Sequence, residues 1–310
     1  ISKLKSKEGR VIVVGGSMGG YAAIILGAWC GANYVFASGV ELKLKLAGGI
    51  SRDLLNGPFV APDLYSIMEN SKTKFILAAG ENNPTDMYSL SLAAKMRCAN
   101  IELISLKLLG HSLPPYLQAT YGYKKIITDV LTTGTVDILE GTGDLFNFPE
   151  ICELLQTLNE IRAGDTRLTD GVVSKLQRIS KETANPDARA HAYNGLSQCF
   201  HVLGMKDKSV AMAKAATRCA PMNWRFLDQY TRTLLSANQP AAAVGVAETS
   251  LHLQKVNLGN IDPFTPILYA KALRQADRLI DAINFSAQIL KESPSNVLWE
   301  LLTELLEDAK

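Results

Sequence analysis

Residues 11–26 of the chain read VIVVGGSMGGYAAIIL, and this stretch decides how the first part of the molecule is interpreted. Its opening run, Val11-Ile12-Val13-Val14, is continuously β-branched and predicts a strand that is buried on both faces. The glycine-rich segment 15–20 predicts a sharp turn, and the apolar run over 21–29 predicts a buried helix. The expected order is therefore strand, tight turn and helix, with Ser17 in the turn.

The turn itself carries a pattern with a chemical meaning. Residues 15–19, Gly-Gly-Ser-Met-Gly, match G-x-S-x-G between a strand and a helix, the setting in which a serine acts as a nucleophile. Glycines at 15 and 19 remove Cβ atoms that would clash in so sharp a turn. The Ser17 hydroxyl would then stand at the carboxyl end of the sheet, above a helix N-terminus that favours negative charge. The backbone N–H of Met18 would be one oxyanion donor.

This segment resembles a known family. Residues 13–26 look like the nucleophile elbow of bacterial α/β-hydrolase-fold serine esterases and acyltransferases. The form Gly-Gly-Ser-Met-Gly-Gly-Tyr-Ala-Ala is also similar to hydrolase-like proteins associated with capsule and surface-polysaccharide pathways. The resemblance covers residues 10–125, and it implies a triad in the order Ser, acid, His and an acyl ester or saccharide substrate.

A histidine stands where that order requires one. His111 follows the last predicted strand in LLGHSLP and is the only histidine in the α/β region. We expect it to be the general base and acid for Ser17, the alternative being a loop histidine without a role. None of the four histidines of the chain has H-x-x-x-H or H-E-x-x-H spacing, so we expect no metal site and no cofactor.

The acidic member has three candidates in one turn, residues 80–86, GENNPTD. The family commonly places Asp near the position of Asn83, where an amide could orient an imidazole but not stabilise imidazolium. We therefore expect Asp86 to supply the carboxylate, with Glu81 as the alternative acid. All three could also be ordinary turn residues.

Strand-like and helix-like runs alternate over residues 1–131, which we assign to an α/β domain with a partial α/β-hydrolase-like parallel sheet. The further strands are expected at 33–38, 74–79 and 101–106, and the further helices at 87–99 and 116–131. Only residues 1–10 precede the first strand, and the chain begins with Ile rather than Met. The N-terminal strands of the complete family fold, with the loop that donates the second oxyanion N–H, are thus expected to be missing. A missing segment, another chain or a reduced, inactive domain would each account for this, and we expect the first strand's edge to be covered.

Residues 132–147, TTGTVDILEGTGDLFN, are expected to be a linker, and residues 148–310 an all-α domain. Within 190–221 the residues resemble the tetratricopeptide pattern, with a serine at 209 where the family usually has alanine. These residues are Tyr193, Leu196, Phe200, Gly204, Ser209, Ala213, Ala216 and Pro221. Small residues let the second helix of a repeat nest against the first, and the proline ends the unit.

The same logic recurs further along the chain. Residues 262–294 repeat it with Tyr269, Leu273, Ala282 and Pro294, residues 223–255 form a degenerate middle unit, and 297–309 would cap the array. The resemblance implies a concave surface for a peptide, a partner subunit or a second copy of the chain. The alternative is a plain helical bundle.

Composition excludes several classes of protein. The net charge of +2, from 32 basic and 30 acidic residues, argues against a nucleic-acid partner. No window of 18 apolar residues exists, so we expect no membrane span. The five cysteines are odd in number and lack C-x-x-C spacing, which favours a reduced, cytoplasmic compartment.

The main hypothesis is serine-dependent ester hydrolysis or acyl transfer, by family analogy on a surface polysaccharide or its precursor. The alternative is a catalytically silent protein-interaction scaffold built on the helical repeats. A third hypothesis is dinucleotide binding, because Gly15-x-Ser17-x-x-Gly20 nearly matches G-x-G-x-x-G and Glu41 follows about 20 residues later. A side chain at Ser17 would obstruct the pyrophosphate and counts against it.

Overall fold

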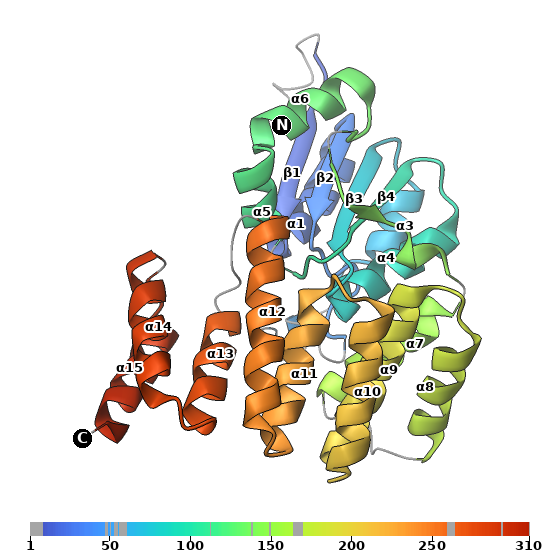
Figure 1. Ribbon diagram of the computed structural model, residues 1–310. Helices are drawn as coiled ribbons and strands as arrows, with labels where there is room; N and C mark the ends of the chain where they lie inside the picture. The colour runs from blue at the N-terminus through green and yellow to red at the C-terminus, as the bar shows by residue number, and fades with distance from the viewer. Residues whose placement is uncertain are drawn as a thin grey trace. The chain divides into compact units, whose positions relative to one another are not determined.

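In the computed structural model the chain forms two compact units, residues 1–169 and residues 170–310. The first unit contains a small parallel sheet with its helices, and the second consists of helices (Figure 1). The structure describes residues 9–46, 49, 51–52, 55, 61–111, 113–137, 139–148, 150–163, 170–258, 264–292 and 294–309. In that part of the chain, no helix is both long enough and apolar enough to cross a membrane.

The first unit is built on a five-stranded sheet whose spatial order follows the sequence. Its strands are β1 (Ile12–Gly16), β2 (Tyr34–Ser38), β3 (Lys74–Gly80), β4 (Ile101–Leu106) and β5 (Thr142–Gly143). The first four are parallel, as the alternation of the sequence predicts, and β5 runs antiparallel to β4. Because parallel strands end at one edge, the loops after β1 to β4 meet at the carboxyl edge of the sheet.

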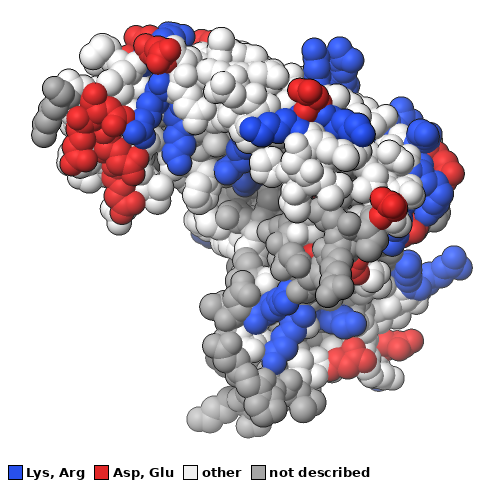
Figure 2. All heavy atoms as spheres, turned by 90° about the horizontal axis from the view of Figure 1, so that it is seen from below, with Lys and Arg blue, Asp and Glu red and all other residues white. Residues whose placement is uncertain are grey.

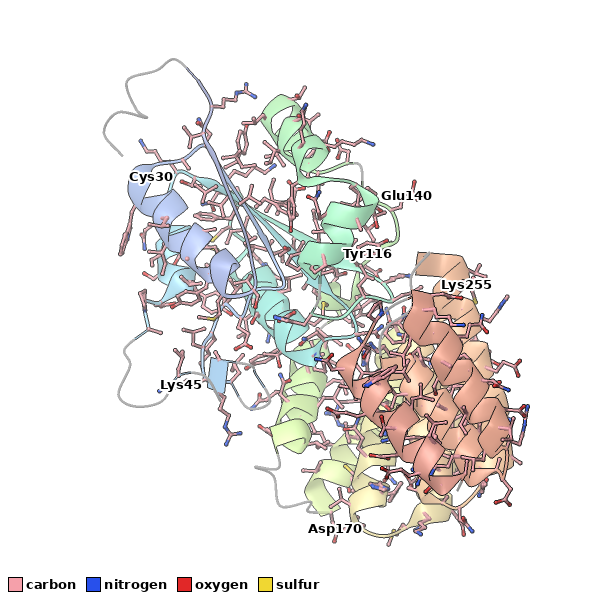
Figure 3. All side chains as sticks on the ribbon, turned by 90° about the vertical axis from the view of Figure 1, so that its left-hand side faces the viewer. Cys30, Lys45, Tyr116, Glu140, Asp170 and Lys255 are labelled. Carbon is pink, nitrogen blue, oxygen red and sulfur yellow. The ribbon has the colours of Figure 1, made fainter. Side chains whose placement is uncertain are left out.

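Helices cover both faces of this sheet. The helices of the first unit are α1 (Met18–Cys30), α3 (Leu64–Glu69), α4 (Pro84–Met96), α5 (Leu113–Thr120), α6 (Tyr123–Thr133) and α7 (Ile151–Ala163), with a 3₁₀ turn η1 (Leu145–Asn147). Cys30 on α1 and Tyr116 on α5 lie on opposite sides of the strands (Figure 3). Central side chains such as Phe36, Phe75 and Leu77 are fully buried, as continuous apolar runs in parallel strands require.

All three helices predicted in the first unit have different bounds in the structure, and α1 begins at Met18, three residues before the expected start. Helix α4 begins at Pro84, three residues before the expected start, because the Asn83 side chain caps it and accepts the N–H groups of Thr85 and Asp86. The single helix expected over 116–131 is two helices, α5 and α6, which are separated at Gly122 with φ of 75°. Asp86 therefore lies in the first turn of a helix rather than in a loop.

The segment expected as a linker is part of the first unit. Its residues Thr142 and Gly143 pair with β4, and Leu145 is fully buried. Helix α7, expected in the helical domain, packs against α4, where the Thr85 hydroxyl lies 3.0 Å from the Asn159 side-chain oxygen. The division between the units therefore follows α7, whereas the sequence placed it before residue 148.

Strand β1 forms one end of the sheet. Among the described residues it pairs only with β2, and all five of its residues are half-buried. Just before it, the Arg10 guanidinium donates to the Leu131 carbonyl in α6 at 2.7 Å. The outer edge of β1 thus has no strand partner in the described part of the chain, and the expectation that something covers it stays a prediction.

The second unit is a succession of helices in which each packs on the next. They are α8 (Asp170–Glu182), α9 (Pro186–Val202), α10 (Lys206–Cys219), α11 (Trp224–Ser236), α12 (Pro240–Leu258), α13 (Phe264–Gln275), α14 (Leu279–Glu292) and α15 (Asn296–Asp308). The hairpins α9–α10, α11–α12 and α13–α14 coincide with the predicted repeat units. The small residues predicted to let α10 nest against α9, Ser209, Ala213 and Ala216, are buried.

One of those small residues, Ser209, differs from the alanine that is usual in the tetratricopeptide pattern. The Ser209 hydroxyl donates to the Ser197 carbonyl of α9 at 2.8 Å, and the two serine hydroxyls are 3.2 Å apart. A serine is small enough for the close helix contact, and its buried hydroxyl is satisfied across it. The substitution therefore keeps the packing that alanine would provide.

Candidate functional site

Ser17 is held in a strained conformation between β1 and α1. Its φ of 53° and ψ of −126° lie where residues other than glycine are rarely found. Three backbone hydrogen bonds hold it there: its N–H donates to the Ser38 carbonyl at 2.9 Å, and its carbonyl accepts the N–H groups of Gly20 at 3.0 Å and Tyr21 at 3.2 Å. The surrounding structure thus fixes an unfavourable backbone in order to present a serine at the carboxyl edge.

Close packing around this turn explains two of its glycines. A Cβ at Gly15 would lie 2.2 Å from the Gly19 carbonyl oxygen, and a Cβ at Gly16 would lie 2.3 Å from Cγ of Pro114. A Cβ at Gly19 would meet nothing within 4 Å. The sequence argument was correct for Gly15 and wrong for Gly19, and it missed Gly16, whose neighbour comes from a distant helix.

The structure brings Ser17, His111 and Asp86 together in one hydrogen-bonded chain. Oγ of Ser17 lies 3.0 Å from Nε2 of His111, and Nδ1 of His111 lies 2.9 Å from Oδ2 of Asp86. When Asp86 is ionised, Nδ1–H donates to it, and Nε2 is left as the acceptor for the serine hydroxyl. The imidazole is thereby placed to take the serine proton.

Asp86 is almost completely buried, with 1% of its surface exposed. Its position in the first turn of α4 places the carboxylate at a helix N-terminus, which favours negative charge. Oδ1 has no hydrogen-bond partner among the described residues, whereas Oδ2 faces His111. Among the described residues, His111 is therefore the hydrogen-bond partner shown for the Asp86 carboxylate.

The other two acid candidates have different tasks. Oε1 of Glu81 accepts the Ser105 hydroxyl of β4 at 2.7 Å and the N–H of Leu145 in η1 at 3.1 Å. Glu81 thus ties the segment around β5 to the sheet. Asn83 spends its side-chain oxygen on capping α4, as described above. Neither residue is placed by these bonds as the orienting partner of His111.

Met18 is the first residue of α1, so its backbone N–H has no acceptor within the helix. It lies directly after Ser17, and the positive end of the helix dipole is at the same place. A developing negative charge beside Ser17 would be stabilised by both. The Met18 side chain is 42% exposed and leaves this end of the helix open.

The features that suggested a dinucleotide are arranged differently. Glu41 is buried and accepts both the hydroxyl and the N–H of Ser51, so its carboxylate is engaged within the protein. In the described sheet β1 has a neighbouring strand on one side only, whereas a dinucleotide lies at a crevice between diverging strand orders. The face shown in Figure 2 carries both basic side chains (Lys and Arg) and acidic side chains (Asp and Glu).

Sequence reasoning missed the pair Ser38-Gly39 at the end of β2. The Ser38 carbonyl holds the Ser17 N–H, and Gly39 has φ of 58°. A glycine directly after a predicted strand was the available signal.

Comparison with known proteins adds little to this geometry. No protein-family model matches the chain, and no curated protein matches it in sequence. A solved structure to which it is similar is that of a thermophilic TPR protein from Thermus thermophilus. The TM-score is 0.41 at 14% sequence identity, over 63% of this chain and 94% of that chain.

Proposed function

We propose that this chain is a serine hydrolase or acyltransferase that acts through an acyl-serine intermediate. The observation that supports this most directly is the continuous chain of contacts from the Ser17 hydroxyl through the His111 ring to the Asp86 carboxylate. Ser17 and His111 come from the segments after β1 and β4, and Asp86 comes from the first turn of α4, which follows β3; they meet because the parallel strands end at one edge. The strained backbone at Ser17 adds a second, independent sign of a nucleophile elbow.

The proposed reaction begins when Nε2 of His111 accepts the Ser17 proton as Oγ attacks the carbonyl carbon of an ester. The negative oxygen of the tetrahedral intermediate is stabilised by the Met18 N–H and the N-terminus of α1. His111 then returns the proton to the leaving alkoxide, which departs as an alcohol and leaves acyl-Ser17. Asp86 stabilises the imidazolium that forms in between.

The second half of the reaction determines the product. Water attacks acyl-Ser17 while His111 removes a proton from that water; the acyl–Oγ bond then breaks, His111 returns the proton to Oγ of Ser17, and the carboxylic acid is released, which is hydrolysis. Attack by a sugar hydroxyl gives acyl transfer. By family analogy we propose an acylated surface polysaccharide or its precursor as the substrate class.

A fluorophosphonate probe tests the proposal, because it bonds covalently to an activated serine. We expect the folded chain to be labelled and the adduct to map to Ser17 by peptide mass spectrometry. Ser17→Ala should abolish labelling, and His111→Ala should reduce it by about 10³-fold or more. His201→Ala, which alters an exposed histidine of the second unit, is the matched control and should label as fast as the unaltered chain. A folded chain that is not labelled would contradict the proposal.

A second candidate function rests on the helical unit. The hairpins α9–α10, α11–α12 and α13–α14 pack in succession, an arrangement that in repeat proteins provides an extended surface for protein partners. We propose a protein-interaction role for this unit, either with a second copy of the chain or with another protein. Sedimentation velocity over a range of concentrations tests the first form, because a chain that stays monomeric throughout would exclude self-association.

A further inference from the structure

The end of β2 lies between Ser17 on one side and the pair His111 and Asp86 on the other. Its last residue, Ser38, accepts the N–H of Ser17 through its carbonyl at 2.9 Å. The next residue, Gly39, donates its own N–H to the Ala78 carbonyl of β3 at 2.8 Å. Two adjacent residues therefore fix the serine turn on one side and remain bonded to the neighbouring strand on the other.

Gly39 also faces the histidine and its carboxylate. A Cβ built on Gly39 would lie 2.9 Å from the His111 carbonyl oxygen, 3.6 Å from Oδ2 of Asp86 and 3.7 Å from Nδ1 of His111. The first distance is closer than a carbon atom tolerates, and the clashing atom belongs to the backbone of the histidine loop. The positive φ of 58° places a second restriction on any other residue at this position.

We infer that Gly39 is a positioning residue for His111. The absence of a side chain lets the histidine loop pack directly on the end of β2, the same end that holds the Ser17 backbone. The distance between the serine oxygen and the imidazole is set by this contact. The consequence for catalysis rests on the proposed function, but the positioning of the ring by Gly39 does not.

The direction of the effect follows from which parts can move. Asp86 is held in the first turn of α4 by the Asn83 cap, and Ser17 is held by its bond to Ser38. A methyl group at Gly39 would therefore displace the His111 loop and leave the other two members in place. Both hydrogen bonds of the ring would lengthen, since both partners stay where they are.

The test compares Gly39→Ala with Gly122→Ala. Gly122 also has a positive φ, of 75°, but a Cβ there would meet nothing within 4 Å, so this variant has the backbone strain without the clash. We expect Gly39→Ala to lower the rate of fluorophosphonate labelling by about 100-fold, the effect of a misplacement of about 1 Å. If the chain hydrolyses an ester substrate, Gly39→Ala should lower kcat for that ester and leave KM unchanged. Gly122→Ala should label at the unaltered rate.

A second measurement does not depend on activity. A ring N–H that donates to a buried carboxylate gives a far-downfield proton resonance in NMR, and we expect His111 to give one in the unaltered chain and in Gly122→Ala. The resonance should be lost or moved in Gly39→Ala while the remaining spectrum stays that of a folded protein. Its retention in Gly39→Ala, or its absence from the unaltered chain, would overturn the inference. If the unaltered chain shows the resonance, Gly39→Ala loses it, and neither chain reacts with the fluorophosphonate, the positioning role of Gly39 stands and only the proposed enzyme activity is contradicted.

Discussion

Each of the two units buries an aspartate, and the surroundings of the two carboxylates differ. In the first unit Asp86 faces the ring of His111, with one oxygen unpartnered among the described residues. In the second unit Asp228 of α11 accepts the hydroxyl of Ser250 on α12 at 2.6 Å and that of Thr265 on α13 at 2.7 Å. Gln254 extends this group by donating to Thr265.

The comparison shows that burial of a carboxylate does not mark a reactive site by itself. A serine or threonine hydroxyl does not take up or release a proton near neutral pH, so the contacts shown for Asp228 join three successive helices and move no proton. An imidazole partner can take up and release a proton near neutral pH, so the contact of Asp86 can support chemistry. The nature of the partner therefore distinguishes the two sites, and each can be tested by removing one partner.

Among the variants that compare the two aspartates, Asp86→Asn should produce the largest effect. The amide keeps the shape of the side chain but can hold the histidine in the wrong tautomer, so we expect the rate of fluorophosphonate labelling to fall by about 10⁴-fold. The free energy of unfolding, measured in urea, should change by less than about 1 kcal/mol, because the amide keeps the volume and can keep the one hydrogen bond to the ring with donor and acceptor exchanged.

The matched variant is Asp228→Asn, which changes the same residue type in the other unit. It should leave the labelling rate unaltered and reduce the free energy of unfolding. If Asp86→Asn destabilised the chain while labelling continued at nearly the unaltered rate, the two aspartates would have the same structural task and the comparison would fail.

Asp228→Ala should destabilise the protein without affecting its reactivity. The hydroxyls of Ser250 and Thr265 would lose their buried acceptor, so we expect the free energy of unfolding to fall by about 3 kcal/mol. Ser286→Ala is the control, because the buried Ser286 hydroxyl has no partner among the described residues. That variant should be neutral to within about 1 kcal/mol. Equal losses in the two variants would show that hydrogen bonding at Asp228 contributes nothing specific.

Glu81→Gln should have a smaller effect in the first unit. The amide can still accept one hydrogen bond, but the charge-assisted bonds from Ser105 and Leu145 are weakened, so we expect a loss of about 1–2 kcal/mol in unfolding free energy. Labelling of Ser17 should continue at the unaltered rate, since the described bonds of Glu81 lead to β4 and η1. A fall in labelling as large as that in Asp86→Asn would return Glu81 to the triad.

The sequence was sufficient to predict the four parallel strands and that Ser17, Asp86 and His111 meet at their carboxyl edge, whereas the catalytic role of these residues stays a prediction. The strand before Ser17, the glycine turn and the helix after it are local features, and the order of Ser17, Asp86 and His111 along the chain follows the resemblance. Parallel strands then bring their loops together without further information. These predictions succeeded because each depended on short segments or on topology.

The parts that were missed depend on contacts between distant segments. Thr142-Gly143 is too short and too polar to show a strand pattern, and it is held by Glu81, which lies far earlier in the sequence. The need for glycine at 16 comes from Pro114, and that at 39 from His111. No periodicity in the sequence reports such contacts, because they arise only when the helices and loops pack.

The smallest effect concerns the fully buried thiol of Cys199 on α9. Burial raises its pKa to about 11 from 9.0, so at pH 8 only about one thiol in a thousand is the reactive thiolate. Iodoacetamide at that pH should leave Cys199 of the folded chain unmodified while the half-buried Cys30 and Cys98 react, as peptide mass spectrometry would show.

The raised pKa of Cys199 means that the folded state keeps a proton that the unfolded state releases. The stabilisation that this proton provides is therefore fully present below pH 9 and falls as the pH rises from 9 toward 11. Rapid modification of Cys199 at pH 8 would show that α9 opens readily, and the contrast between the half-buried Ser17 of the first unit and the enclosed thiol of the second would be lost.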